Sequence, residues 1–152
     1  MKNSRIFIDR LVESFLIAIL GVMVVNVLWQ VFTRFFTNSP SSFTDELARY
    51  LMIWLGILGA AYVTGKNEHV AIDFFVKKFS EKLQKLISSF ISISVLSFAF
   101  FGMLIGGCRL VYITTKLAQY SPSLKIPLAV VYAIVPLSGL LIIFYKLTQS
   151  KK

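Results

Sequence analysis

The sequence predicts an all-α membrane protein with four transmembrane helices, an amphipathic in-plane helix between helices 2 and 3, and both termini in the cytoplasm. Two observations carry this prediction. The chain of 152 residues is 57% hydrophobic, with a mean hydropathy of +0.76, which is too apolar for an ordinary soluble domain. Four long runs also lack any charged residue, at 14–33, 50–65, 86–108 and 126–145. About 20 such residues cross a bilayer as a helix.

These runs predict a single membrane domain over residues 1–152. The four transmembrane helices are predicted at about 11–36, 45–65, 86–116 and 126–146. The in-plane helix is predicted at about 70–85. The first run follows basic residues, as a signal peptide would. It is too long for a signal h-region and lacks a small-residue cleavage site, so we interpret it as a retained helix.

The formal net charge of +9 is divided unevenly between the loops. Lys and Arg residues concentrate before helix 1, between helices 2 and 3, and after helix 4. The positive-inside rule therefore places the two termini and the middle loop in the cytoplasm. Because membrane orientation explains the basic residues, we expect no nucleic-acid partner.

The residue types that carry most enzyme chemistry are scarce. Cys108 is the single cysteine and His69 the single histidine, so one chain can form neither an internal disulfide nor a His-rich metal site. No Gly-rich phosphate loop or Ser/His/Asp set is present. We therefore predict that the chain is not an enzyme and holds no cofactor or metal.

A polar ridge runs along helix 1, because Asn26, Gln30 and Arg34 recur every four residues on one face. Polar groups in hydrocarbon need partners, so the ridge predicts a helix-contact surface. Arg34 is expected to pair with Asp45 or Glu46 at the start of the antiparallel helix 2. Snorkelling of Arg34 to the outer interface is the alternative.

Helix 2 opens with an ionic cluster of Asp45, Glu46 and Arg49 and carries Trp54 about midway. Gly56 and Ala60 follow at four-residue spacing, which allows close approach by a neighbouring helix. In helix 3, Gly102 and Gly106 form a GxxxG spacing, and Pro136 predicts a kink in helix 4.

The in-plane helix alternates Phe and Lys at helical spacing, which is typical of a helix lying in the cytoplasmic headgroup layer. The residues assigned to this membrane-surface helix are Phe74, Phe75, Lys77, Lys78, Phe79 and Lys82. A different hypothesis starts from Glu13 in helix 1. A self-sufficient small four-helix multidrug exporter, acting as a dimer, would carry a proton-coupled carboxylate there, although Asp9 and Arg10 lie only one turn away.

Several short motifs in one order resemble a known family over nearly the whole chain. They are Asn26, Gln30, Arg34-Phe35, Thr44-Asp45-Glu46-Leu47-Ala48-Arg49, Trp54-Leu55-Gly56, Gly59-Ala60-Ala61, His69-Val70-Ala71-Ile72-Asp73, Ser121-Pro122-Ser123-Leu124, Ile126-Pro127, Tyr132 and Pro136-Leu137. The chain is similar to the small membrane subunit (DctQ-like) of tripartite ATP-independent periplasmic (TRAP) transporters, and most like members from sialic-acid uptake systems.

The resemblance implies an accessory scaffold in the bacterial inner membrane. The small subunit would brace a large multi-helix subunit that imports an organic anion, a carboxylate or sialic acid, delivered by a periplasmic binding protein. Sodium ions would bind the large partner, and this chain would need no cofactor. The subunit-interface or structural residues implied are Asn26, Gln30, Arg34, Asp45, Glu46, Arg49, Trp54, Gly56, Ala60, His69 and Asp73. His69 and Asp73 would fix the turn into the surface helix.

Overall fold

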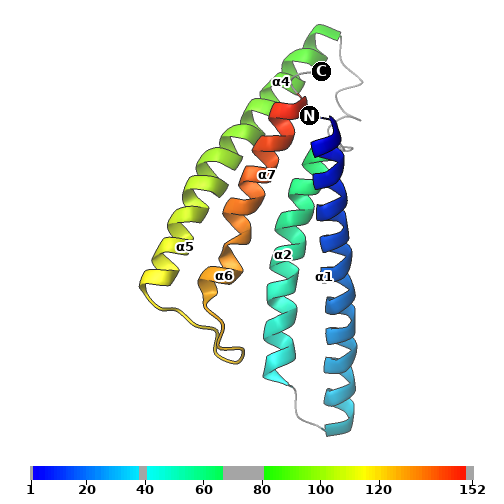
Figure 1. Ribbon diagram of the computed structural model, residues 1–152, viewed down its shortest axis with the longest axis vertical. Helices are drawn as coiled ribbons and strands as arrows, with labels where there is room; N and C mark the ends of the chain where they lie inside the picture. Colours follow the sequence, from blue (N-terminus) through cyan, green and yellow to red (C-terminus); the bar gives the residue numbers. More distant parts are fainter. Residues whose placement is uncertain (1, 38–40, 67–80, 150–152) are drawn as a thin grey trace.

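The computed structural model describes residues 2–37, 41–66 and 81–149, and these residues are mainly helical (Figure 1). In chain order the elements are α1 (Lys2–Thr37), α2 (Ser42–Lys66), α4 (Glu81–Ser97), the π-helix η1 (Phe98–Gly106), α5 (Gly107–Lys116), α6 (Leu128–Tyr132) and α7 (Ile134–Gln149). The described residues contain no strand, apart from an isolated bridge between Tyr120 and Pro127.

Four helical stretches are long and apolar enough to cross a membrane, which confirms the predicted all-α fold with four spanning helices. They are Arg5–Phe36, Ser42–Lys66, Leu83–Lys116 and Leu128–Thr148. The third span differs in its start from the sequence-based boundary, because α4 already begins at Glu81 and includes residues expected in the in-plane helix. The remainder of that helix, residues 70–80, lies outside the described residues.

The spanning helices stand side by side in a single layer (Figure 1). α1 packs along α2, α2 along α7, and α7 along η1, so the order across the layer is first, second, fourth, third. We call the end that holds Lys2 and Gln149 the termini end. The opposite end, with Thr37, Ser42 and the 117–127 loop, is the turn end. A single layer leaves both of its faces free of other parts of the described chain.

The buried core is small for a chain of this length. One cluster joins Val12, Leu58 and Ile134 from three helices, and a second joins Ala61, Ala99 and Ile142.

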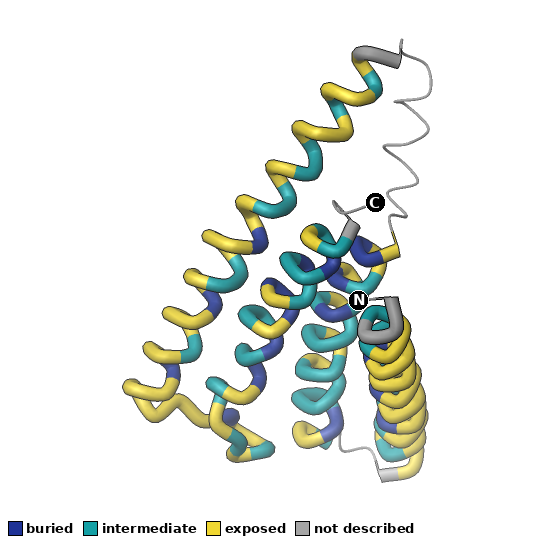
Figure 2. The backbone as a smooth tube through the Cα atoms, turned by 45° about the horizontal axis from the view of Figure 1, so that its top comes forward, coloured by how far each residue is buried: buried dark blue, intermediate teal, exposed yellow. Residues whose placement is uncertain are grey.

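Most large apolar side chains remain exposed, and Figure 2 shows long exposed stretches along α1 and α4. Val25 and Phe98, for example, are each 67% exposed. Exposed apolar surface of this extent fits a protein surrounded by lipid or by partner helices.

The third and fourth spans are irregular where they face each other. Pro136 has no backbone N–H and cannot bond to the carbonyl of Tyr132, and the helix breaks at Ala133 between α6 and α7. The break therefore lies within one turn of the proline at which the sequence predicts a kink. η1 packs against α7 beside it.

Glycines allow this close packing. A Cβ placed on Gly139 would lie 2.9 Å from Met103 Cβ and 3.1 Å from the Ala99 carbonyl oxygen. A Cβ on Gly107 would lie 2.8 Å from Pro136 Cδ. The predicted GxxxG pair does not make this contact, since a Cβ on Gly102 would meet the Phe98 ring of its own helix.

Candidate functional site

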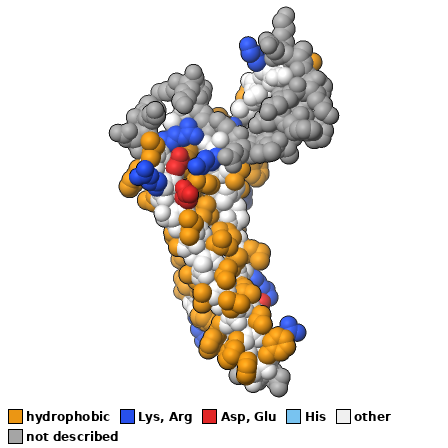
Figure 3. Space-filling model, turned by 90° about the vertical axis from the view of Figure 1, so that its right-hand side faces the viewer, with side chains coloured by type: hydrophobic (Ala, Val, Ile, Leu, Met, Phe, Trp, Pro, Cys, Tyr) orange, Lys and Arg blue, Asp and Glu red, His pale blue; other side chains and the backbone are white. Residues whose placement is uncertain are grey.

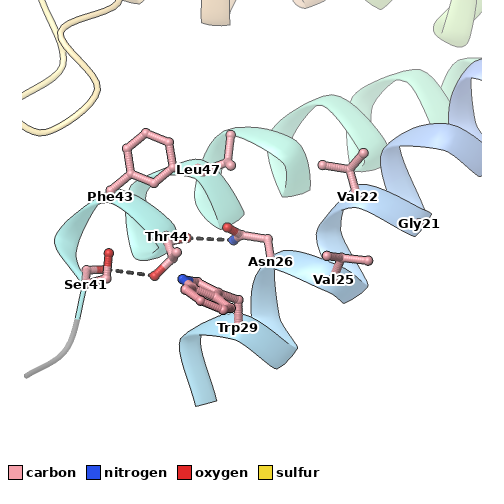
Figure 4. Close-up of a pocket in the computed structure, with 9 residues that line it drawn as sticks. All are labelled: Gly21, Val22, Val25, Asn26, Trp29, Ser41, Phe43, Thr44 and Leu47. Atoms are coloured by element: carbon pink, nitrogen blue, oxygen red, sulfur yellow. Dashed lines mark hydrogen bonds between the residues drawn. The ribbon is translucent and has the colours of Figure 1, made fainter. Parts of the chain in front are cut away.

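The turn end of the α1–α2 hairpin is held by Asn26, which is 7% exposed. Asn26 Nδ2 donates to the Thr44 carbonyl oxygen at 2.8 Å, and Thr44 Oγ1 donates to the Ser41 carbonyl oxygen at 2.9 Å (Figure 4). The ridge residue Asn26 therefore bonds to the backbone of α2 in the same chain. This bond fixes the level of α1 against α2.

A groove of about 600 Å³ lies beside this bond (Figure 4). Its walls are mainly apolar, and its lining residues are Gly21, Val22, Val25, Asn26, Trp29, Ser41, Phe43, Thr44 and Leu47. Because Asn26 Nδ2 already bonds to the Thr44 carbonyl oxygen and Thr44 Oγ1 to the Ser41 carbonyl oxygen, the groove suits an apolar occupant such as an acyl chain or a partner side chain.

Glu46 connects α2 to the loop at 117–127. Its Oε2 accepts the backbone N–H groups of Ser123 at 2.8 Å and Leu124 at 3.0 Å, and its Oε1 accepts the Tyr50 hydroxyl at 2.8 Å. The loop is also closed by its own backbone, since Ser121 N–H donates to the Ile126 carbonyl oxygen at 2.9 Å. The loop is therefore a defined surface rather than a loose connection.

The structure corrects the expected pairing of Arg34 with a carboxylate of α2. Asp45 pairs with Arg49 on its own helix at 2.6 Å, and Glu46 binds the loop. Arg34 takes part in neither ion pair found among the described residues. The reason is the register, because Arg34 lies two helical turns beyond Asn26 and so beyond the start of α2.

Trp54 joins three helices at the middle of the row. Its indole Nε1 donates to the Val131 carbonyl oxygen at 3.0 Å, close to the break between α6 and α7. Its ring lies 6.0 Å from the ring of Phe15 in α1. An indole N–H buried in an apolar layer needs such an acceptor.

A polar network at the termini end was not anticipated from the sequence. Arg5 Nη2 donates to the Gly65 carbonyl oxygen at 2.5 Å, and Arg5 also approaches Asp9 at 3.9 Å. One turn further along α1, Glu13 Oε2 accepts the Tyr62 hydroxyl at 3.3 Å. Figure 3 shows a group of charged side chains toward this end, while apolar side chains cover much of the face between it and a few charged side chains near the turn end.

Tyr145 brings α7 into the same network. Its side chain is fully buried, Arg5 lies over its ring at 6.0 Å, and a Cβ on Gly65 would come within 2.6 Å of that ring. Gly65 is therefore a close-contact position. In the sequence, the adjacent Lys66 indicates only the end of a helix. That signal does not predict that Gly65 packs against an aromatic ring.

The small residues expected to receive a neighbouring helix face away from the rest of the described chain. Gly56 and Ala60 are both exposed, and a Cβ on Gly56 would meet nothing within 4 Å. Gln30 is partly buried, and its carbonyl oxygen accepts the Thr33 hydroxyl at 3.0 Å. The structure thus brings Asn26, Asp45, Glu46, Arg49 and Trp54 into contacts within the chain.

The remaining site residues lie in or beside the part of the chain that is not described. Residues His69, Asp73, Phe74, Phe75, Lys77, Lys78 and Phe79 fall outside the described residues, and Lys82 lies in the first turn of α4. Within the described ranges, no group of three or more His, Cys, Asp or Glu side chains could hold a metal ion.

Comparison with known proteins gives a consistent result. Residues 23–150 match the protein family described as "Tripartite ATP-independent periplasmic transporters, DctQ component". A "Putative TRAP transporter small permease protein" of Haemophilus influenzae is 36% identical over 91 residues, covering 58% of this chain and 56% of that protein. The "Sialic acid TRAP transporter small permease protein SiaQ" of Vibrio cholerae is 30% identical over 96 residues, covering 63% of this chain and 56% of SiaQ.

A longer protein also matches. The "Sialic acid TRAP transporter permease protein SiaT" of Haemophilus influenzae is 32% identical over 93 residues, which cover 59% of this chain but 14% of SiaT. The aligned part of the chain spans a little over half the length of the two small permease relatives.

Proposed function

The chain belongs to the DctQ-component family of tripartite ATP-independent periplasmic (TRAP) transporters, and from this premise we propose that it braces a larger permease subunit in the membrane. The family is a transporter component and not an enzyme. Two of the relatives named above carry the name small permease protein. The proposed role is that of a scaffold, with the solute pathway in another chain.

The single-layer arrangement of the spanning helices is the observation that carries this proposal. Among the described residues, α1 packs on α2, α2 on α7 and α7 on η1, so these helices form a row rather than a closed ring. Solute sites in membrane proteins generally form between helices that surround them. A row with two free apolar faces instead offers a long wall against which a larger helix bundle can pack.

The match to SiaT supports a large membrane partner. The aligned segment is a small part of SiaT, so a sequence like this one occurs inside a much longer permease protein. We propose that the partner of this chain is a separate subunit, which corresponds to the rest of SiaT. Gly56 and Ala60, which are both exposed here, are positions for that meeting.

For the transported solute we propose an organic anion, of the carboxylate or sialic-acid class, imported with sodium that binds the large subunit. SiaQ and SiaT are named for sialic acid, and this supports the class.

For orientation we propose the bacterial inner membrane, with the termini end in the cytoplasm and the turn end in the periplasm. The distribution of Lys and Arg along the sequence supports this orientation.

A periplasmic binding protein is the third proposed component, and the turn end is its proposed contact. Both carboxylates of α2 there are engaged, by Arg49 and by the loop backbone. Arg34, Lys116 and Lys125 are exposed. The turn end therefore presents uncompensated positive charge, which suits an acidic surface on the binding protein.

The exporter hypothesis is not retained. The family assignment points to a multi-component transporter, and Glu13 accepts the Tyr62 hydroxyl in a network that joins α1 to α2. A structural contact of this kind accounts for the carboxylate.

Reconstitution tests the proposal directly. The chain alone in proteoliposomes is expected to give no uptake of a labelled sialic acid or C4-dicarboxylate, with sodium inside or outside. The chain together with a large permease and a binding protein of the same transport system is expected to give sodium-dependent uptake, and omission of the chain should abolish it. Uptake by the isolated chain would overturn the scaffold role.

A further inference from the structure

α1 reaches well past α2 at the turn end (Figure 1). The register is fixed by the bond from Asn26 to the Thr44 carbonyl oxygen. α1 continues eleven residues beyond Asn26, to Thr37, whereas α2 begins two residues before Thr44, at Ser42. With a rise of 1.5 Å per residue, α1 extends about 13 Å further than α2.

This offset separates the charged residues of the two helices. Arg34 lies eight residues beyond Asn26 toward the turn end, and Arg49 lies five residues on the other side of Thr44. The two arginines are therefore about 20 Å apart along the helix axes. Arg49 is well exposed, with 72% of its side chain accessible in the pair with Asp45.

The surface of α1 between these two levels is apolar. Residues 14–33 carry no charge, and these 20 residues of helix are about 30 Å long, the thickness of the hydrocarbon layer. Near the end of this run, Leu28 is 64% exposed and Val31 is 47% exposed. If hydrocarbon reached residue 33 all around the row, the Asp45–Arg49 pair would lie about 12–18 Å inside it, where charges are costly.

Tilting the row reduces this conflict without removing it. Neighbouring helix axes are about 9 Å apart, so a tilt of about 40°, the upper end of the usual range, shifts their relative depth by about 8 Å. The Arg49 guanidinium is bonded to Asp45, whose level is about 12 Å inside residue 33, so about 4 Å of depth remains even at this tilt and more at smaller tilts. This remaining depth points to a local departure from a flat membrane surface.

We propose that water enters a recess beside α2 at the turn end and reaches as deep as Arg49, while α1 at the same and more outward levels is covered by hydrocarbon. The helical period supports two different environments, because Asp45, Arg49 and Met52 share one face of α2. The apolar groove residues Phe43 and Leu47 lie on the opposite face.

The 117–127 loop lies at the mouth of this recess. Glu46 holds Ser123 and Leu124 at the level of the first turn of α2, well short of the end of α1. Ser123 and Lys125 are exposed at that level. The proposed recess therefore fits water. It depends on the membrane-spanning fold but not on which solute the complex carries.

Cysteine accessibility tests the proposal in the assembled complex, in intact cells and in inverted vesicles. A Cys108→Ala background removes the native thiol. Four single-cysteine variants are then made in it: Arg49→Cys, Ser123→Cys, Leu28→Cys and Val31→Cys. Each variant is treated with a charged, membrane-impermeant maleimide or with a lipophilic one. We expect Arg49→Cys and Ser123→Cys to react with the charged reagent. Leu28→Cys and Val31→Cys, although further out along the row, should react with it about tenfold more slowly or less, but readily with the lipophilic reagent.

Met52→Cys is the control for depth, because it lies about 5 Å deeper on the same face as Arg49 and is 62% exposed. It should not react with the charged reagent. The double variant Asp45→Asn/Arg49→Cys repeats the Arg49 measurement without an unpaired carboxylate. Equal reactivity of Leu28→Cys and Arg49→Cys with the charged reagent would overturn the recess. So would a lack of reaction of Arg49→Cys with the charged reagent, or of Leu28→Cys with the lipophilic one.

Discussion

Glu46 Oε2 accepts the backbone N–H of Ser123 at 2.8 Å, and this bond joins α2 to a loop 77 residues later in the chain. The same carboxylate also accepts the Leu124 N–H and the Tyr50 hydroxyl. One side chain thus organises the turn end of the second and fourth spanning helices.

Replacing Glu46 tests this connection. Glu46→Ala removes the acceptor for two backbone N–H groups and should lower the melting temperature of the purified chain in detergent. Asp45→Asn is the matched control, because the exposed Asp45–Arg49 pair contributes little. We also expect trypsin to cut after Lys125 sooner in Glu46→Ala. Identical melting and cleavage in the two variants would contradict the role of Glu46.

Trp54 is the second test. Trp54→Phe keeps an aromatic ring beside Phe15 but removes the donor to the Val131 carbonyl oxygen, so it should lower the free energy of unfolding by about 1 kcal/mol. Trp54→Ala also removes the packing and should cost about 3–5 kcal/mol. Trp29→Phe, at a 57% exposed position, is the control and should change stability little. Equal effects at the two tryptophans would argue against the hydrogen bond.

Two glycine-to-alanine variants form a matched pair. Gly139→Ala places a methyl group 2.9 Å from Met103 Cβ and 3.1 Å from the Ala99 carbonyl oxygen, and should destabilise the chain by about 1–3 kcal/mol. Gly56→Ala adds the same methyl group where nothing lies within 4 Å, so it should not destabilise. Thermal unfolding in detergent measures the difference. A more harmful Gly56→Ala would show that the helix packing described above is wrong.

The exposed face of α2 is tested by assembly rather than by stability. Gly56→Leu should leave the melting temperature of the isolated chain almost unchanged, because the space around Gly56 is open. In the proposed complex the larger side chain would prevent close approach of a partner helix, and co-purification of the large permease should fall about tenfold or more. Val25→Leu, at an exposed position of α1, is the control. Unchanged co-purification would place the partner on another surface.

The four spanning helices were predictable from the sequence, because runs without charge have a length set by the bilayer. The break near Pro136 was predictable for a similarly local reason, the missing N–H. In each case the physical cause lies within a few consecutive residues, so no knowledge of neighbouring helices was needed.

Most side-chain contacts of the candidate site could not be predicted from the sequence. The Arg34 prediction was wrong because it assumed that α1 and α2 end at the same level, whereas the Asn26–Thr44 bond sets an offset. The partners of Glu46 are backbone N–H groups, which have no sequence signature. The close-packing glycines were also missed, since Gly107 and Gly139 are recognisable only from what faces them.

The one-layer order of the helices has a mechanical consequence. Across the middle of the row, α2 and α7 meet along one seam, and the bonds of Trp54 and Glu46 are distributed along it. α1 also reaches α7, because Arg5 lies over the Tyr145 ring and Val12 packs with Ile134. Loss of the seam together with these contacts would separate two pairs of packed helices, α1 with α2 and η1 with α7.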